Sequence, residues 1–107
     1  MNLFLALVAV AGAQYDADAH LLQAKGVAAA DLRAPSASIA RVKAERQARE
    51  RAEKKLAAAL KELGYKKDFD ELLKKAEVAD EQYGSDGSIE LLLKLDTSDL
   101  KLRHEKD

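Results

Sequence analysis

Cysteine is absent from the 107 residues of this chain, which excludes disulfide bonds, thiolate catalysis and metal sites built from cysteine. Aromatic residues make up 5% of the sequence and tryptophan is absent, so any core must be thin and aliphatic. Neither sign of charge dominates, because 18 lysines and arginines face 19 aspartates and glutamates. This balance removes the usual electrostatic argument for a nucleic-acid or anionic-membrane partner.

A long hydrophobic run is missing too. Residues 3–11 are apolar, but a membrane-spanning helix takes about 20 residues. The run has the length of a signal-peptide hydrophobic region, and Ala11, Gly12 and Ala13 form a small-x-small cleavage motif after it. The basic segment that usually precedes such a run is not there. We predict a signal peptide over residues 1–13, export, and no transmembrane span after cleavage; a buried N-terminal strand or helix is the alternative.

Residues 14–19 are predicted to be a linker in which acidic residues alternate with alanine. Asp16, Asp18 and His20 occupy alternate positions, and alternate residues of an extended chain project to one side. Carboxylates and imidazole suit a divalent ion, but no fourth ligand is evident nearby. A solvated segment is the favoured interpretation, so we predict no metal site and no cofactor.

Residues 20–29 are the first strand candidate, with Leu22, Ala24 and Gly26 on one face. The glycine and small alanines of this stretch indicate a place where another backbone comes close. A loop follows over residues 31–35, because proline fixes its own φ and biases the residue before it away from the helical region.

Residues 36–64 predict one long helix. Ser36 or Ser38 can cap its first turn, and Gly64 can take the conformation that lets the chain turn away. Apolar residues recur at steps of three and four, the spacing of one helix face. They are Ala44, Ala48, Ala52, Leu56, Leu60 and Leu63. The alanine half is expected to lie close on a sheet, and the leucine half to fill the wider end of the core.

Basic residues crowd the same helix. They are Arg41, Lys43, Arg46, Arg49, Arg51, Lys54 and Lys55. Nucleic-acid binding would need these charges unopposed, with aromatic residues for stacking or an element that reads a groove. Glutamates are interleaved with them and no aromatic residue is, so a solvated charged face is favoured over a polyanion-binding patch.

The remainder of the chain predicts a short helix over residues 68–76, capped by Asp68, and two strands over residues 77–83 and 88–97. Residues 84–87, Gly-Ser-Asp-Gly, are a turn signal that joins the strands into an antiparallel hairpin. Residues 98–107 are predicted to be a flexible tail, and His104 within it has no assigned role.

These elements predict an α+β fold of order β-α-α-β-β in a single α/β domain over residues 20–97. The long helix, with the short one, would pack on a three-stranded sheet that ends in the C-terminal hairpin. So small a sheet leaves its edges exposed, which favours a partner strand or self-association.

A recognisable catalytic constellation is missing. Asp80, Glu81 and Asp86 are candidates for acid–base chemistry, but a hydrolase needs a positioned pair in a pocket, and carboxylates in turns and edge strands are ordinarily solvated. Asp86 is better explained by the turn, with Gly87 taking a positive φ. We therefore predict no enzymatic activity, no catalytic or cofactor-binding residues, and no small-molecule substrate.

The strand with Lys25 and Gly26, the Pro-Ser loop, the helix IARVKAERQARERAEKKL and the hairpin YGSDGSIE together resemble the lipoprotein-20 family of bacterial cell-envelope proteins. The related N-terminal domain of a flagellar assembly protein shares the likeness, which covers residues 21–95. The resemblance implies an exported, non-enzymatic α/β module of the periplasm or outer membrane. This chain lacks the cysteine to which the family's lipid is attached, which indicates a soluble periplasmic or secreted form.

The resulting prediction is a structural or interaction module of the cell envelope that associates with a protein partner or with itself. The alternative is a small domain that binds polyanions or nucleic acid through the basic face of its long helix.

Overall fold

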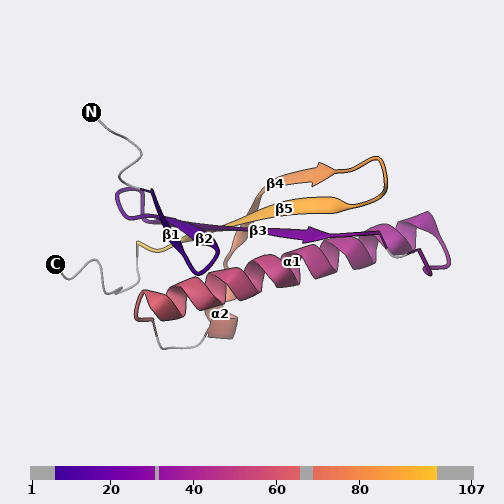
Figure 1. Cartoon of the computed structure of the whole chain (residues 1–107). Coiled ribbons are helices and arrows are strands. Elements are labelled where there is room, and N and C mark those ends of the chain that lie inside the picture. The colour runs from indigo at the N-terminus through magenta and orange to yellow at the C-terminus, as the bar shows by residue number, and fades with distance from the viewer. Residues whose placement is uncertain (1–6, 31, 66–68, 99–107) are drawn as a thin grey trace.

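A computed structural model describes residues 7–30, 32–65 and 69–98 of the chain. Its elements are β1 (Leu7–Val10), β2 (Ala13–Asp16), β3 (Leu21–Ala28), α1 (Ala37–Glu62), α2 (Phe69–Leu73), β4 (Glu77–Tyr83) and β5 (Ile89–Asp96). The strands form one sheet in the order β1-β2-β3-β5-β4, and neighbouring strands are antiparallel. Helix α1 runs along one face of this sheet (Figure 1). The predicted Asp68 cap and the tail with His104 lie outside the described residues, apart from Ser98.

The predicted three-stranded sheet is wrong, because the sheet has five strands. β3, β4 and β5 lie where the sequence predicts them, and β1 and β2 come from residues that were predicted to be leader and linker. Ala11 and Gly12 join β1 to β2 with φ angles of 48° and 88°. Positive φ at both central residues is what a type I′ hairpin turn requires. Ala-Gly is not a typical sequence for this turn, so the pattern of the sequence does not indicate the hairpin.

The β1–β2 hairpin contributes to the core. Ala13 and Tyr15 of β2 are 2% and 1% exposed. At the hairpin tip, a Cβ added at Gly12 would lie 3.7 Å from the side chain of Lys55 on α1. A buried N-terminal strand was the alternative that the sequence left open. Export of the chain stays a prediction.

Both ends of α1 are confirmed. The Ser36 hydroxyl accepts a hydrogen bond from the Ile39 amide at 3.2 Å, as an N-cap does. At the other end Gly64 has a φ of 95°, its amide donates to the Lys61 carbonyl, and the Tyr65 amide donates to the Leu60 carbonyl. This pair of bonds is a Schellman motif, which satisfies carbonyls that the helix itself leaves free.

The predicted apolar line of α1 is confirmed as its buried face. Ala44, Ala48, Ala52, Leu56, Leu60 and Leu63 are each at most 1% exposed. The backbone of the helix comes close to the sheet at Gly26 of β3, where an added Cβ would overlap the carbonyl group of Ala48. The predicted close approach of a second backbone is therefore also confirmed.

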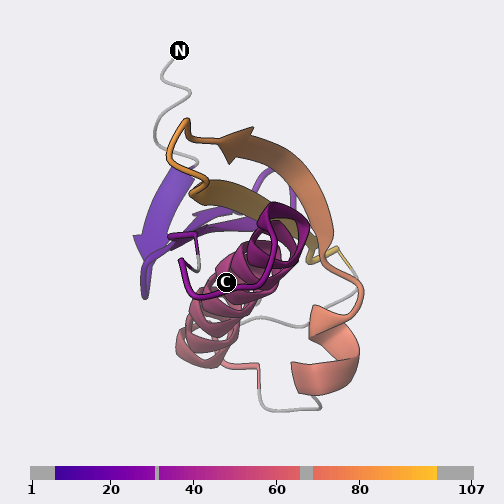
Figure 2. The same cartoon turned by 90° about the vertical axis from the view of Figure 1, so that its right-hand side faces the viewer.

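The wider, leucine end of α1 packs beside α2. Leu72 of α2 is 6% exposed, and Tyr65 and Phe69 make an edge-to-face contact with ring centroids 5.6 Å apart. Figure 2 shows the sheet arching over α1, with the β1–β2 hairpin on one side of the helix and β4 and α2 on the other. The borders of the sheet, β1 and β4, therefore lie on opposite sides of the molecule.

Candidate interaction surface

β4 is one border of the sheet, with β5 as its neighbour. All seven of its residues are exposed, whereas β5 buries every second residue. A register shift between Val78 and Asp80 interrupts the pairing, so the regular part of the border covers residues 80–83. The sequence of β4, EVADEQY, has neither the lysine nor the proline that commonly guard a sheet edge.

The hydrogen-bond alternation along β4 shows which backbone groups point outward. The Gly84 amide donates to the Ser88 carbonyl at 2.9 Å, so Gly84 and Ser88 form a hydrogen-bonded pair at the end of the hairpin. Antiparallel strands alternate between hydrogen-bonded and non-bonded pairs. Gln82 therefore points its backbone groups toward β5, and Glu81 and Tyr83 point theirs away from the sheet. These outward groups are the ones that an added strand would bind.

Tyr83 anchors this border to α1. Its hydroxyl lies 2.8 Å from Glu45 Oε1 and 2.6 Å from Glu81 Oε2, and its ring lies under the Arg41 guanidinium, 4.1 Å from the ring centroid. Hydrogen bonds to Glu81 and then Glu45 raise the pKa of the Tyr83 phenol, since its ionisation would place a third negative charge beside them; Arg41 opposes this effect. The sequence pattern did not single out Tyr83. The available signal was an aromatic residue directly before a glycine turn.

Three acidic side chains make β4 negative: Glu77, Asp80 and Glu81. Across the described ranges, ion pairs join Lys25 to Glu90, Arg41 to Glu45, Arg49 to Glu53 and Lys74 to Glu71, and none involves the acids of β4. Glu81 pairs with Leu91 on the helix side of the sheet, whereas Asp80 pairs with Leu92 on the opposite face. An extended partner would therefore meet a carboxylate on each of its two faces.

The turn after β4 is built from its own side chains. Asp86 Oδ1 accepts hydrogen bonds from the Ser88 hydroxyl at 2.6 Å and the Ser88 amide at 3.0 Å, and these bonds lower the pKa of Asp86. Gly87 has a φ of 86°, so the positive φ predicted for it is confirmed. Asp86 thus has a structural role in this turn.

The acid–base candidates are not brought together. Asp80 and Glu81 lie on opposite faces of β4, and Asp86 lies in the turn beyond the strand. Asp80 accepts a hydrogen bond from the Gln82 amide group at 3.3 Å, and Glu81 is bonded to Tyr83. All three side chains are exposed.

The possible metal triplet does not form one face either. After Asp16 the chain turns, and Asp16 Oδ1 accepts the Ala19 amide at 3.1 Å. His20 closes the turn with a φ of 53°. Within the part of the chain that the structure describes, no three histidine or acidic side chains gather in a way that could hold a metal ion.

His20 instead lines a hollow of about 300 Å³. The other lining residues are Ala19, Leu21, Lys75, Glu77, Lys94 and Asp96. Asp96 accepts the Ser98 amide at 2.8 Å, which is the main cause of its lowered pKa, and His20 contributes less. Cationic and anionic groups are mixed around this hollow, so it favours neither sign of ligand.

The basic residues of α1 mostly make contacts within the protein. Arg51 Nη1 and Lys55 Nζ donate to the Val27 and Lys25 carbonyls of β3, at positions beyond those that β2 pairs. Arg49 is half-buried, and it donates to Glu53 at 3.1 Å and to the Ala76 carbonyl at 3.2 Å. Arg49 is therefore an exception to the predicted solvated charged face, since it ties α1 to the segment before β4.

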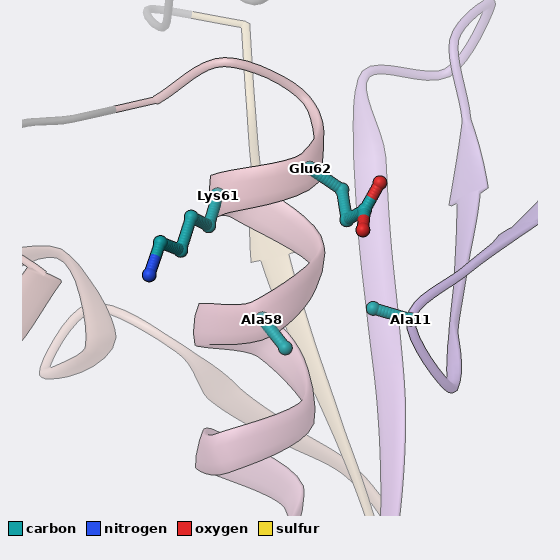
Figure 3. A pocket seen from close by; sticks show the side chains of 4 residues that line it. All are labelled: Ala11, Ala58, Lys61 and Glu62. Atoms are coloured by element: carbon teal, nitrogen blue, oxygen red, sulfur yellow. The ribbon is translucent and has the colours of Figure 1, made fainter.

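A second hollow, of about 410 Å³, lies between the β1–β2 turn and the end of α1. Figure 3 shows Glu62 directed toward the hairpin while Lys61 extends away from it; Ala58 lies on the preceding turn of the helix and Ala11 on the hairpin. The side chains of Lys61 and Glu62 point in different directions, so this hollow does not bring polar groups together as a catalytic or ligand-binding site would.

Comparison of the chain with protein-family models, with curated proteins and with solved structures gives no match. No helix within residues 7–30, 32–65 and 69–98 is long and apolar enough to cross a membrane.

Proposed function

We propose that this protein is an exported, non-enzymatic interaction module of the bacterial cell envelope, periplasmic or associated with the outer membrane. Its partner is another protein, which binds at β4. The observation that carries the proposal is the open border of this strand, where every side chain is exposed and the backbone of Glu81 and Tyr83 faces outward. Support for export comes from the apolar run and its small-x-small motif, together with the family resemblance.

The position of β4 makes this surface independent of leader cleavage. Cleavage after Ala13 would remove β1 and leave the rest of β2 at that border. β4 lies at the opposite border, two strands away from β3, and is anchored to α1 rather than to the hairpin. Cleavage would therefore remove no strand that pairs with β4.

Polyanion binding through α1 receives less support from the geometry. Four of its basic side chains are already engaged within the protein. Arg41 contacts the Tyr83 ring and Arg49 contacts Glu53. Arg51 and Lys55 donate to carbonyls of β3. A polyanion would have to compete for these side chains, and releasing Arg51 and Lys55 would leave carbonyls of β3 without their donors.

The proposal is tested by placing a photo-cross-linking amino acid at Gln82 of the full chain in the bacterium that produces it. We expect a discrete protein adduct in the envelope fraction, and a mature N-terminus near Gln14. The matched control carries the same group at Lys54, on the outer side of α1. Recovery of the chain in the cytoplasm with an intact Met1 would contradict export, and equal adducts from both positions would contradict β4 as the binding surface.

A further inference from the structure

We infer that the segment received by β4 is a basic, extended stretch of the partner that joins the sheet as an added strand. This inference rests on the proposed function and goes further, because it specifies the chemistry and conformation of the partner. It follows from three features of β4: its unpaired backbone, its charge and its anchorage.

The backbone sets the conformation of the partner. Glu81 and Tyr83 each direct an amide and a carbonyl out of the sheet, because their neighbours Gln82 and Gly84 pair toward β5. An extended segment can satisfy these groups by continuing the ladder, as in other cases of strand addition. The register shift at Val78 confines the regular template to residues 80–83, so a short segment is enough to fill it.

Charge sets the composition of the partner. Asp80 and Glu81 have no ion pair within the described ranges, and they lie on opposite faces of the strand. Lysine or arginine on both faces of the incoming strand would therefore meet carboxylates, and opposite charges across neighbouring strands are stabilising. A second copy of this chain fits poorly, since it would bring two sets of the same carboxylates to one junction.

Anchorage keeps the edge in a fixed position. Tyr83 is held to α1 by Glu45 and Arg41, and Arg49 holds the Ala76 carbonyl immediately before β4. Both ends of the strand are thus tied to the helix while its outer border stays open. Because β4 is already held in place, binding has to order only the incoming segment, which lowers the entropy cost of association.

The test uses the full chain labelled with ¹⁵N and two synthetic peptides of equal length, one alternating lysine with valine and one alternating glutamate with valine. We expect the lysine peptide to shift amide resonances of β4 and to slow hydrogen exchange at Glu81 and Tyr83, and the glutamate peptide to do neither. Absence of binding by the lysine peptide, equal binding of the two peptides, or shifts centred on α1 would overturn the inference.

Variants separate charge from backbone. The double variant Asp80→Asn with Glu81→Gln should weaken binding of the lysine peptide about tenfold, a modest charge effect at an exposed site. The matched double variant Glu50→Gln with Glu62→Gln on α1 should leave binding unchanged.

Glu81→Pro removes an outward amide and should abolish binding while β5 keeps its resonances. If Glu81→Pro fails to fold, the two double variants decide the outcome. Equal loss of lysine-peptide binding in the β4 double variant and in the α1 double variant would overturn the inference. If the lysine peptide fails to bind but Gln82 still cross-links a protein, the proposed function stands and the basic strand is wrong.

Discussion

At the scale of single residues, Gly26 explains how a long helix can lie on so small a sheet. The position opposite the Ala48 carbonyl has no room for a Cβ, and its φ is not in the left-handed region, so space rather than backbone conformation requires glycine there. Ala44 and Ala52, one turn to either side of Ala48, are also buried, and a Cβ at position 26 would crowd the Ala52 backbone nitrogen as well. The alanine half of α1 is therefore the half that approaches β3 at Gly26.

We expect Gly26→Ala to lower the free energy of unfolding by about 3 kcal/mol, the upper end of the usual cost of overpacking, because a backbone carbonyl must move to admit the methyl group. The urea midpoint of the full chain measures this change. Val27→Ala is the matched control, since Val27 is 50% exposed. Equal midpoints for the two variants would contradict the close approach of α1 and β3.

The pKa of Tyr83 should lie above 10.0, its ordinary value, because the carboxylates of Glu81 and Glu45 beside its hydroxyl favour the protonated phenol. A pKa raised in the folded state gives stability that is present below the unfolded pKa and is lost as pH rises through the folded pKa. The ring resonances of Tyr83 across an alkaline titration measure it. Glu81→Gln should lower this pKa, whereas Glu90→Gln, on the other face of the sheet, should not. An unchanged pKa in Glu81→Gln would contradict the hydrogen bond between Tyr83 and Glu81.

At the scale of elements, the charged side of α1 is part of the fold. Arg51 and Lys55 cover the stretch of β3 that β2 does not reach, and Arg41 and Arg49 hold the border at β4. The sequence predicted a solvated face because charge composition does not show which backbone carbonyls the long basic side chains contact. Such chains lay their apolar stems along the surface and place their donors where carbonyls remain free.

Arg49→Ala should therefore lower the free energy of unfolding by about 1 kcal/mol, a value reduced by the partial exposure of its ion pair with Glu53. Thermal or urea unfolding measures the loss. Arg46→Ala removes the same side chain from an exposed position of α1 and should stay within about 0.5 kcal/mol of the parent. If both variants behave alike, Arg49 contributes nothing as a link to the segment before β4.

Elements with a strong period or clear end signals were predictable from sequence. The caps at Ser36 and Gly64, the buried line of α1 and the C-terminal hairpin all follow from local rules. The β1–β2 hairpin was not predictable, because its apolar run also fits a signal peptide and its Ala-Gly turn carries no typical signature. Tyr83 was missed because its contact with Glu45 joins residues 38 positions apart in the sequence.

At the scale of the whole molecule, the two borders of the sheet differ in kind. One border is a hairpin made from the apolar start of the chain, and part of the β3 edge beside it is covered by side chains of α1. The other border, β4, is acidic, exposed and held at both ends. The proposed function uses the β4 border, whose outward backbone has no partner strand within the described residues and whose position is fixed by α1.

Amide hydrogen exchange of the free full chain tests this claim most directly. An open border predicts fast exchange at Glu81 and Tyr83, whose amides face outward, and slow exchange at Gln82 and Gly84, whose amides face β5. Slow exchange at Glu81 and Tyr83 without any added partner would mean that the border is already covered, and would contradict the account.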